Sequence, residues 1–216
     1  LLTKNSFALY GKNGINIFEP SNGGNGIKLN TPNPIFIEIV VLINKTITIE
    51  SYDGTAVING KYTDYIFYIT DKGSLTLKNI EFLNTEYSTV KTYSAIVNYG
   101  NLNVENSFFD NATGLRAGII LNYGNLTVNN SEFKNNTAKY YGGAITNFGF
   151  ANIVNSLFES NTATEGEAIL NTYDMFISNS RFIDNNISSN KYQKVESLID
   201  ISSSYFTENS DIFVKD

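Results

Sequence analysis

Acidic side chains that follow a recurring phenylalanine are the first candidates for chemistry in this chain: Asp110, Glu159, Asp184 and Glu208. On successive turns of a β structure the last three carboxylates would stand about 5–10 Å apart, which overlaps the separations used by glycosidases. Any two acids on neighbouring turns reach that separation, so the pattern is also typical of solvated turn residues. The chain has two arginines, Arg116 and Arg181, and no histidine or cysteine. We therefore predict no catalytic residue, no metal site and no cofactor.

Aromatic side chains offer a second kind of chemistry, the binding of sugar rings. Tyr99, Tyr123 and Phe148 each stand ten residues before a recurring phenylalanine, and asparagines lie close by in the sequence. Aromatic faces beside amide groups are suited to flat carbohydrates, although the rings could instead only stack on one another. Further tyrosines lie on segments of irregular length, where recognition residues are common: Tyr87, Tyr93, Tyr140, Tyr141 and Tyr192. The predicted ligand-binding residues are Tyr99, Tyr123, Phe148, Tyr140 and Tyr141.

A sequence repeat is the element that must align these residues. Phenylalanine recurs with asparagine three residues before it, or serine in the last unit, at Phe82, Phe109, Phe133, Phe158, Phe182 and Phe206. The intervals are 27, 24, 25, 24 and 24 residues, which is in the range of solenoid repeats. Within each unit, as in NYGNLTVNNSEF (122–133), apolar and polar residues alternate with the two-residue period of strands. The repeat predicts stacked β coils.

Counting back from each phenylalanine predicts which side chains point inward. Apolar residues stand five and seven positions before it, as Val128 and Leu126 do before Phe133. A second strand carries an isoleucine thirteen positions before it, and a third begins at the phenylalanine. Three short strands per turn describe a parallel β-helix, here of about eight coils by length over period, with the phenylalanine rings stacked inside.

Two asparagine columns mark the expected bends between strands. One stands three residues before the phenylalanine, and the other eleven before it: Asn98, Asn122, Asn147 and Asn171. Asparagine tolerates left-handed backbone, and its amide can bond to the same amide on the next coil. We expect both columns to form buried ladders, joined by a serine column (Ser107, Ser131, Ser156, Ser180 and Ser204), and expect Gly73, Gly100, Gly124 and Gly149 to supply permissive backbone at the other bend.

The beginning of the chain differs from the repeat. Residues 1–34 are rich in Gly and contain Pro, whereas strand-like segments start at residue 35. A solenoid needs a cap because its end strand would otherwise pair with other molecules. We assign residues 1–34 to an N-terminal cap with entry strands and residues 35–216 to one continuous β-helix.

Composition narrows the classes of partner. The formal charge is −6, and Lys and Arg do not cluster, which argues against nucleic acid and acidic membranes. The chain starts at Leu1 and has no apolar run of transmembrane length, so we interpret it as part of a longer protein whose signal and anchor lie outside it. Six Asn-x-Ser/Thr sequons are compatible with export, although an Asn-rich chain produces them by chance: Asn44, Asn111, Asn125, Asn129, Asn135 and Asn186.

Several repeat motifs resemble a known group of surface proteins. GGAITNFG (142–149) matches the GGA-I half, and FKNNTA (133–138) and FESNTA (158–163) match the F-x-x-N half, of the paired repeat of chlamydial polymorphic outer-membrane proteins. With NYGNLTV between the halves, the unit looks most like the large adhesin-like proteins of methanogenic archaea. Other units are degraded, such as GLRAGII (114–120) and GEAIL (166–170). The resemblance implies a right-handed β-helix at the cell surface that acts in attachment.

The hypothesis drawn from these observations is an extracellular adhesin module. It would be a monomeric rod that presents a lateral face and projecting loops to glycans or proteins of other cells, without entering a membrane. One alternative is a polysaccharide lyase or glycosidase of β-helix type, and a second is a passive spacer. The enzyme hypothesis predicts clustered acids with a basic group among them, and the binding hypothesis predicts an exposed aromatic strip. The spacer hypothesis predicts neither feature.

Overall fold

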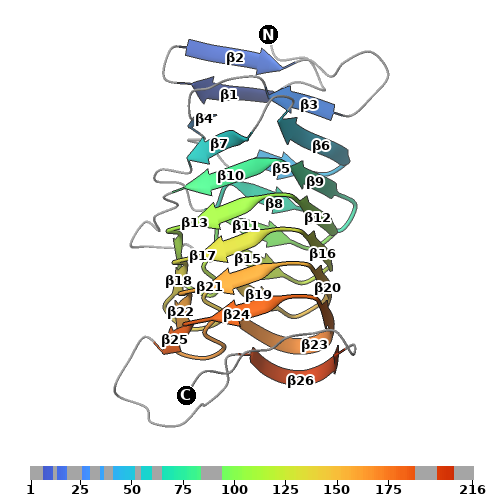
Figure 1. The fold of residues 1–216 in the computed structure, drawn as a ribbon. Helices are drawn as coiled ribbons and strands as arrows, with labels where there is room; N and C mark the ends of the chain where they lie inside the picture. The colour runs from blue at the N-terminus through green and yellow to red at the C-terminus, as the bar shows by residue number, and fades with distance from the viewer. Residues whose placement is uncertain are drawn as a thin grey trace.

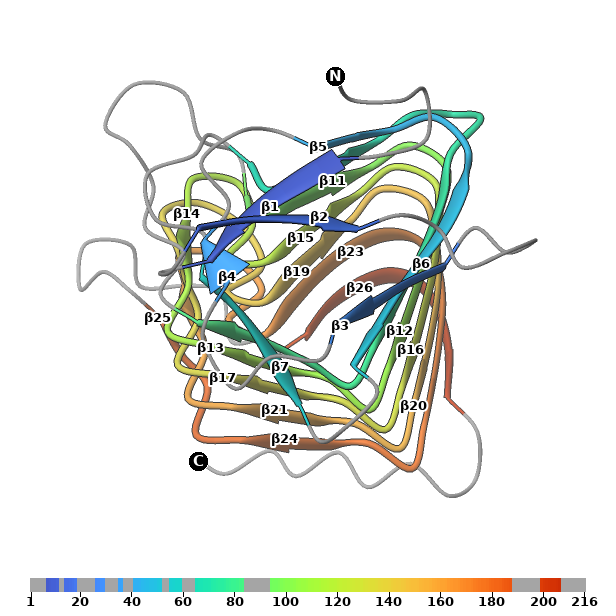
Figure 2. The ribbon, with the colours of Figure 1, turned by 90° about the horizontal axis from the view of Figure 1, so that it is seen from above.

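The computed structural model describes residues 7–11, 14–18, 26–29, 35–36, 41–51, 55–59, 65–83, 94–187 and 199–206. All regular elements in this part of the chain are β-strands. They stack along one axis, with the N-terminal strands at one end and β26 at the other (Figure 1). Seen along that axis, successive coils superimpose and enclose a single interior (Figure 2). The predicted parallel β-helix is confirmed.

Each coil places its strands in the same positions, so that like strands form parallel ladders. The first ladder contains β5 (Val41–Ile43), β8 (Phe67–Ile69), β11 (Ile96–Asn98), β15 (Ile120–Asn122) and β19 (Ile145–Asn147). The second contains β3 (Gly26–Leu29), β6 (Thr46–Ser51), β9 (Ser74–Lys78), β12 (Asn101–Glu105), β16 (Asn125–Asn129) and β20 (Phe150–Val154). Both ladders end on the long strand β23 (Ile169–Ser178), which pairs with β26 (Ile199–Phe206).

The third ladder begins one residue before the recurring phenylalanine in most coils. It contains β4 (Ile35–Phe36), β7 (Ala56–Asn59), β10 (Ile80–Leu83), β13 (Phe108–Asp110), β17 (Glu132–Lys134), β21 (Leu157–Glu159) and β24 (Arg181–Ile183). A short fourth ladder was not predicted: β14 (Thr113–Gly114), β18 (Thr137–Ala138), β22 (Thr162–Ala163) and β25 (Asn186–Ile187). The register pairs each repeat position with itself, for example Phe109 with Phe133, so the columns in the sequence are columns in space.

The predicted number of about eight coils is too high. Five regular coils follow one another from β8 to β24, and β5, β6 and β7 form one less regular coil before them. The first strands, β1 (Phe7–Gly11) and β2 (Gly14–Phe18), pair antiparallel as a hairpin and add no coil. Beyond β25, β26 is the one strand that the described residues contribute. Dividing the chain length by the repeat period overcounts the coils, because this treats both ends of the chain as regular repeats.

The two ends of the chain depart from the regular coil in different ways. The β1–β2 hairpin joins the third ladder through β4, with which β1 pairs antiparallel. Strand β3, by contrast, pairs parallel with β6 and extends the second ladder. The hairpin therefore lies across the N-terminal end, as a cap would, while the division at residue 34 stays a prediction.

The interior is filled by the predicted apolar columns. The rings of Phe82, Phe109, Phe133, Phe158 and Phe182 are fully buried, and their centroids follow one another at 4.7–5.0 Å with near-parallel planes. The columns five and seven residues before them are buried on every coil from Leu75 to Ile177, and the residues between them face outward. Stacked rings add about 0.5–1.5 kcal/mol per pair to the burial of their surface.

The asparagine column eleven residues before phenylalanine is the buried ladder that the sequence predicts. Each side-chain amide donates to the amide oxygen one coil further on, from Asn98 to Asn122, from Asn122 to Asn147 and from Asn147 to Asn171, at 2.6 Å each. The side chains are at most 1% exposed. These asparagines lie at the bend between the first and second strands of each coil. The residue that follows each of them, such as Tyr99 after Asn98, lies on the outside.

The other asparagine column departs from the prediction. Asn79, Asn106, Asn130, Asn155 and Asn179 have φ between 47° and 55°, so the left-handed backbone is confirmed. Their side chains are not buried, however, and the bond from Asn130 Nδ2 to Asn106 Oδ1 lies at the surface. The turn directs these amides outward because the left-handed residue reverses the side on which its Cβ lies. Serine fills the buried position instead, with the Oγ of Ser131 accepting from the backbone N–H of Ser107.

The predicted role of the glycines also needs correction. Gly73, Gly100, Gly124 and Gly149 do not have left-handed φ angles. A Cβ on Gly124 would lie 2.2 Å from the backbone oxygen of Gly100 on the preceding coil. These glycines are needed because the coils approach closely at the first bend, and that close approach brings the neighbouring aromatic rings into contact.

Candidate functional site: an aromatic ladder, a polar face and a groove

The predicted aromatic residues form a ladder along the first bend. The rings of Tyr99 and Tyr123 are 4.8 Å apart at 7°, and those of Tyr123 and Phe148 are 5.2 Å apart at 21°. Tyr68 and Tyr65 extend the ladder towards the N-terminus, with centroid distances of 5.6 Å and 5.8 Å. The ladder therefore spans five rings, two more than the sequence analysis identified. The sequence analysis missed Tyr68, although its place between the inward residues Phe67 and Ile69 of β8 directs its side chain outward.

Stacking decides which part of each ring a ligand can reach. Because successive rings are nearly parallel, the faces between Tyr99 and Tyr123 are covered by each other. Tyr99 is nevertheless 43% exposed, so ring edges and hydroxyl groups face solvent. The stacking of these rings is confirmed, and their role in binding stays a prediction, restricted to ring edges and hydroxyls because a sugar cannot lie between the rings.

Burial favours the neutral form of the Tyr99 hydroxyl. Partial burial raises the pKa of Tyr99 above its ordinary 10.0, and the hydroxyls of the other ladder tyrosines act in the same direction. The nearby Arg116 guanidinium lowers this pKa, but with the smallest effect. Tyr99 is therefore a neutral hydrogen-bond donor and acceptor through the physiological pH range.

Tyr140 and Tyr141 lie elsewhere, on the segment between β18 and β19. Their ring centroids are 6.1 Å apart, and the Lys139 Nζ lies 5.2 Å from the centroid of Tyr140. Tyr140 is 42% exposed. Within the described residues no ring contact joins this pair to the aromatic ladder, so the five predicted binding residues form two separate groups. Tyr87, Tyr93 and Tyr192 lie outside the described residues.

The three candidate acids that the structure describes do not form one cluster. Asp110 accepts a hydrogen bond from Asn135, whereas Glu159 forms an ion pair with Lys134. Asp184 lies at a left-handed bend with φ of 49°, and Glu208 is outside the described residues. In the part of the chain that the structure describes, no group of three or more acidic, histidine or cysteine side chains could hold a metal ion.

A flat polar face extends from the aromatic ladder to the second bend. It consists of the outward side chains of β9, β12, β16 and β20, among them Asn101, Asn103, Asn125, Thr127 and Asn152. The Nδ2 of Asn125 donates to the Oδ1 of Asn101 at 3.0 Å, and Asn103 donates to Glu105 at 2.8 Å. The face presents rows of amides and hydroxyls, which are groups that bind sugar hydroxyls, together with the exposed ring of Phe150 and the charged side chains of Lys78 and Glu105.

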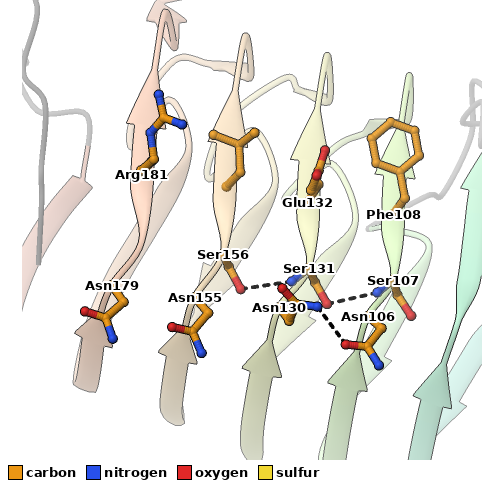
Figure 3. Close-up of a pocket in the computed structure, with 11 residues that line it drawn as sticks. Asn106, Ser107, Phe108, Asn130, Ser131, Glu132, Asn155, Ser156, Asn179 and Arg181 are labelled. Carbon is orange, nitrogen blue, oxygen red and sulfur yellow. Dashed lines mark hydrogen bonds between the residues drawn. The ribbon is translucent and has the colours of Figure 1, made fainter.

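A groove of about 400 Å³ follows the second bend, where sequence analysis identified no site. One wall is the left-handed asparagine column, and the other is formed by the outward residues Phe108, Glu132, Leu157 and Arg181, one from each of four successive coils (Figure 3). Ser107, Ser131 and Ser156 line the space between the walls (Figure 3). The sequence analysis missed the groove because it assigned the asparagine side chains to the interior.

A lysine bridges two acids beside this groove. The Nζ of Lys134 lies 2.9 Å from Glu132 and 3.3 Å from Glu159 on the next coil. The hydrogen bond to Glu132 raises the pKa of Lys134 above its ordinary 10.5; burial opposes this effect and Glu159 reinforces it. Lys134 therefore forms an ion pair with each carboxylate, and its single positive charge offsets part of their combined negative charge.

Comparisons with known proteins give a likeness of fold only. No family model matches the chain, and a search of curated proteins finds no match. Among solved structures, a mutant of the PL6-family alginate lyase AlyGC is similar with a TM-score of 0.34 and 12% identity, over 84% of this chain and 36% of that chain. The chain thus spans about a third of the lyase. No helix in the described residues is long and apolar enough to cross a membrane.

Proposed function

We propose that this chain is an adhesive module of a cell-surface protein, a stiff β-helix that attaches to glycans through a lateral face. The observation that carries the proposal is the continuous ladder of five aromatic rings beside a flat face of amides and hydroxyls. Exposed ring edges supply apolar contact, while the tyrosine hydroxyls and asparagine amides supply hydrogen bonds. The ladder runs along the axis, which suits an extended ligand.

The setting of the module is part of the proposal. The resemblance of its repeats to adhesin-like proteins of methanogenic archaea supports an extracellular location and attachment to other cells. The side chains of all six sequon asparagines are exposed, which is compatible with that location. We further propose that the module acts as a monomer and that Tyr140 and Tyr141 form a secondary contact on their projecting segment.

Binding to a broad panel of neutral glycans and cell-wall polysaccharides tests this function. The wild-type chain should retain a subset of them, and the double variant Tyr99→Ala, Tyr123→Ala should lose that retention while keeping most of its thermal stability. The matched control is Tyr173→Ala, which removes a tyrosine that is 55% exposed and that makes no ring contact with the ladder within the described residues.

Three other outcomes would contradict the proposal. A large loss of stability with binding intact would show that the rings only stiffen the bend. Product analysis after long incubation distinguishes the enzyme alternative, because shortened polysaccharide chains would replace attachment by cleavage. Neither binding nor cleavage would leave a passive spacer.

A further inference from the structure

The groove at the second bend has the shape of a site for an extended chain. Its two walls take one residue from each of four successive coils, so it runs along the axis of the rod. Its volume of about 400 Å³ is within the range of about 300–1,000 Å³ that is usual for ligand sites. Adjacent coils are about 4.8 Å apart, which is close to the length of one sugar in an extended polysaccharide, so each coil can address one sugar.

The asparagine wall has hydrogen-bonding capacity that no bond among the described residues uses. Asn130 donates to Asn106 at 2.8 Å, but Asn155 turns away and donates to Asn129 at 3.2 Å. No hydrogen bond of the Asn179 side chain occurs among the described residues. Within the part of the chain that the structure describes, the Oδ1 of Asn155 and the amide of Asn179 therefore keep hydrogen-bonding capacity in the C-terminal half of the groove.

The serines between the walls, in contrast, are already engaged. The Oγ of Ser156 donates to the backbone oxygen of Val154 and accepts from the N–H of Ser131. Ser131 and Ser107 repeat this arrangement on the preceding coils. These hydroxyls hold the bend together, so recognition must come from the two walls.

The two charged residues of the opposite wall differ in their partners. Glu132 forms an ion pair with Lys134, whereas Arg181 is exposed and forms no ion pair within the described part of the chain. Between them Leu157 offers an apolar surface for the C–H groups of a sugar ring. A guanidinium binds a carboxylate through two parallel N–H···O bonds, and without such a partner Arg181 is a cation next to unused amides.

We propose that this groove is a second binding site, for an extended acidic polysaccharide whose sugar hydroxyls bond to Asn155 and Asn179 and whose carboxylate is held by Arg181. The site lies at the other end of the second strand ladder from the aromatic ladder, and its ligand class goes beyond the neutral glycans proposed for the aromatic ladder. An extended acidic peptide fits the groove less well, because its residue spacing of about 3.3 Å does not match the coils.

Calorimetric titration with polygalacturonate tests the proposal, with its fully methyl-esterified form as the uncharged control ligand. The wild-type chain should bind the acid form and bind the ester at least about tenfold more weakly, as expected for one lost charge-assisted pair. Arg181→Gln should weaken binding of the acid form by a similar factor. Arg116→Gln removes the same charge from the other arginine and should leave the affinity unchanged.

The outcomes that overturn the proposal are distinct. Equal losses in Arg181→Gln and Arg116→Gln would mean nonspecific attraction, and no binding of the acid form would refute the site. Preferential binding of poly-L-glutamate that depends on Arg181 would replace the polysaccharide by a peptide. The double variant Tyr99→Ala, Tyr123→Ala should still bind polygalacturonate, so failure of the ladder and failure of the groove can be told apart.

Discussion

Asparagine recurs at fixed positions in this solenoid and serves in two ways, through its buried amide and through its tolerance of left-handed backbone. Eleven residues before phenylalanine its amide forms the buried ladder of Asn98, Asn122, Asn147 and Asn171. Three residues before phenylalanine its backbone takes the left-handed conformation and its side chain faces the groove. Three residues after phenylalanine it forms a second buried ladder, in which Asn136 donates to Asn161 and Asn161 to Asn185.

Replacing a buried ladder residue should be costly. Asn122→Ala removes one buried hydrogen bond each from the Nδ2 of Asn98, the Oδ1 of Asn147 and the backbone oxygen of Phe150. We expect a loss of about 1–3 kcal/mol or more in the free energy of unfolding, measured by urea denaturation. Asn125→Ala on the same coil removes an exposed amide and should change it by less than about 0.5 kcal/mol. Equal effects of the two variants would argue against the buried ladder.

At Asn130 the backbone conformation should matter more than the side chain. Its φ is 49°, and the side chain is exposed. Asn130→Ala should lower the free energy of unfolding by about 1–2 kcal/mol because alanine is strained in the left-handed region. Asn130→Gly should lose much less, since glycine adopts that region freely. If denaturation curves show the same loss for both variants, the hydrogen bond to Asn106 matters more than the backbone conformation.

At the scale of elements, strands are held to their neighbours on adjacent coils by side chains as well as by backbone hydrogen bonds. Lys78 on β9 lies 3.7 Å from both Glu50 on β6 and Glu105 on β12, and Lys134 on β17 bridges to Glu159 on β21. Like residues in a column would repel one another if all were charged alike. Alternating charges along a column avoid that repulsion and favour the observed register.

The Lys134 bridge predicts a specific pH dependence. Its pKa is raised in the folded chain, so its contribution is complete below the ordinary value of 10.5 and is lost as pH rises through the raised value. Lys134→Gln should therefore lower stability by up to about 1 kcal/mol at neutral pH, and the difference from wild type should vanish in strong alkali. Denaturation at a series of pH values measures this, with exposed Lys72→Gln as the control. A difference that persists above the lysine range would contradict the ion-pair account.

At the scale of the whole molecule, the chain is a rod in which each coil contacts its neighbours only. The buried phenylalanine stack runs through five coils without interruption, from Phe82 to Phe182. In such a solenoid stability is approximately the sum of the contributions of the single coils and of the interfaces between adjacent coils. A defect in a central coil therefore weakens two interfaces, and the rod that presents the lateral face depends on an unbroken stack.

The central ring of this stack should be the most sensitive. Phe133 stacks on Phe109 at 4.7 Å and on Phe158 at 4.8 Å. Phe133→Ala should lower the free energy of unfolding by about 3–5 kcal/mol through the lost burial and the cavity left behind. Phe150→Ala, which removes a ring 36% exposed at the surface, is the control and should have a much smaller effect. Similar melting temperatures for the two variants would show that the interior can collapse around the gap.

The fold and much of its interior followed from the amino-acid sequence alone. A strand exposes alternate residues, and parallel coils stack like residue on like, so the spacing of Phe109, Phe133 and Phe158 determined both the β-helix and its columns. The same reasoning located the ladder of Tyr99, Tyr123 and Phe148 and the buried amides of Asn98 and Asn122. These are local or periodic properties, and each is visible in one repeat and confirmed by the next.

Only the tertiary structure decided where polar side chains point at the bends and what they surround. Asn106 and Asn122 are the same residue type at two bends, yet one faces solvent and the other the interior, because the side on which Cβ lies depends on φ. That difference opens the groove between Asn179 and Arg181, while the close approach of the coils covers the ring faces of Tyr99 and Tyr123. Sequence spacing does not encode φ, and so the candidate sites could be located only once the coils were closed in space.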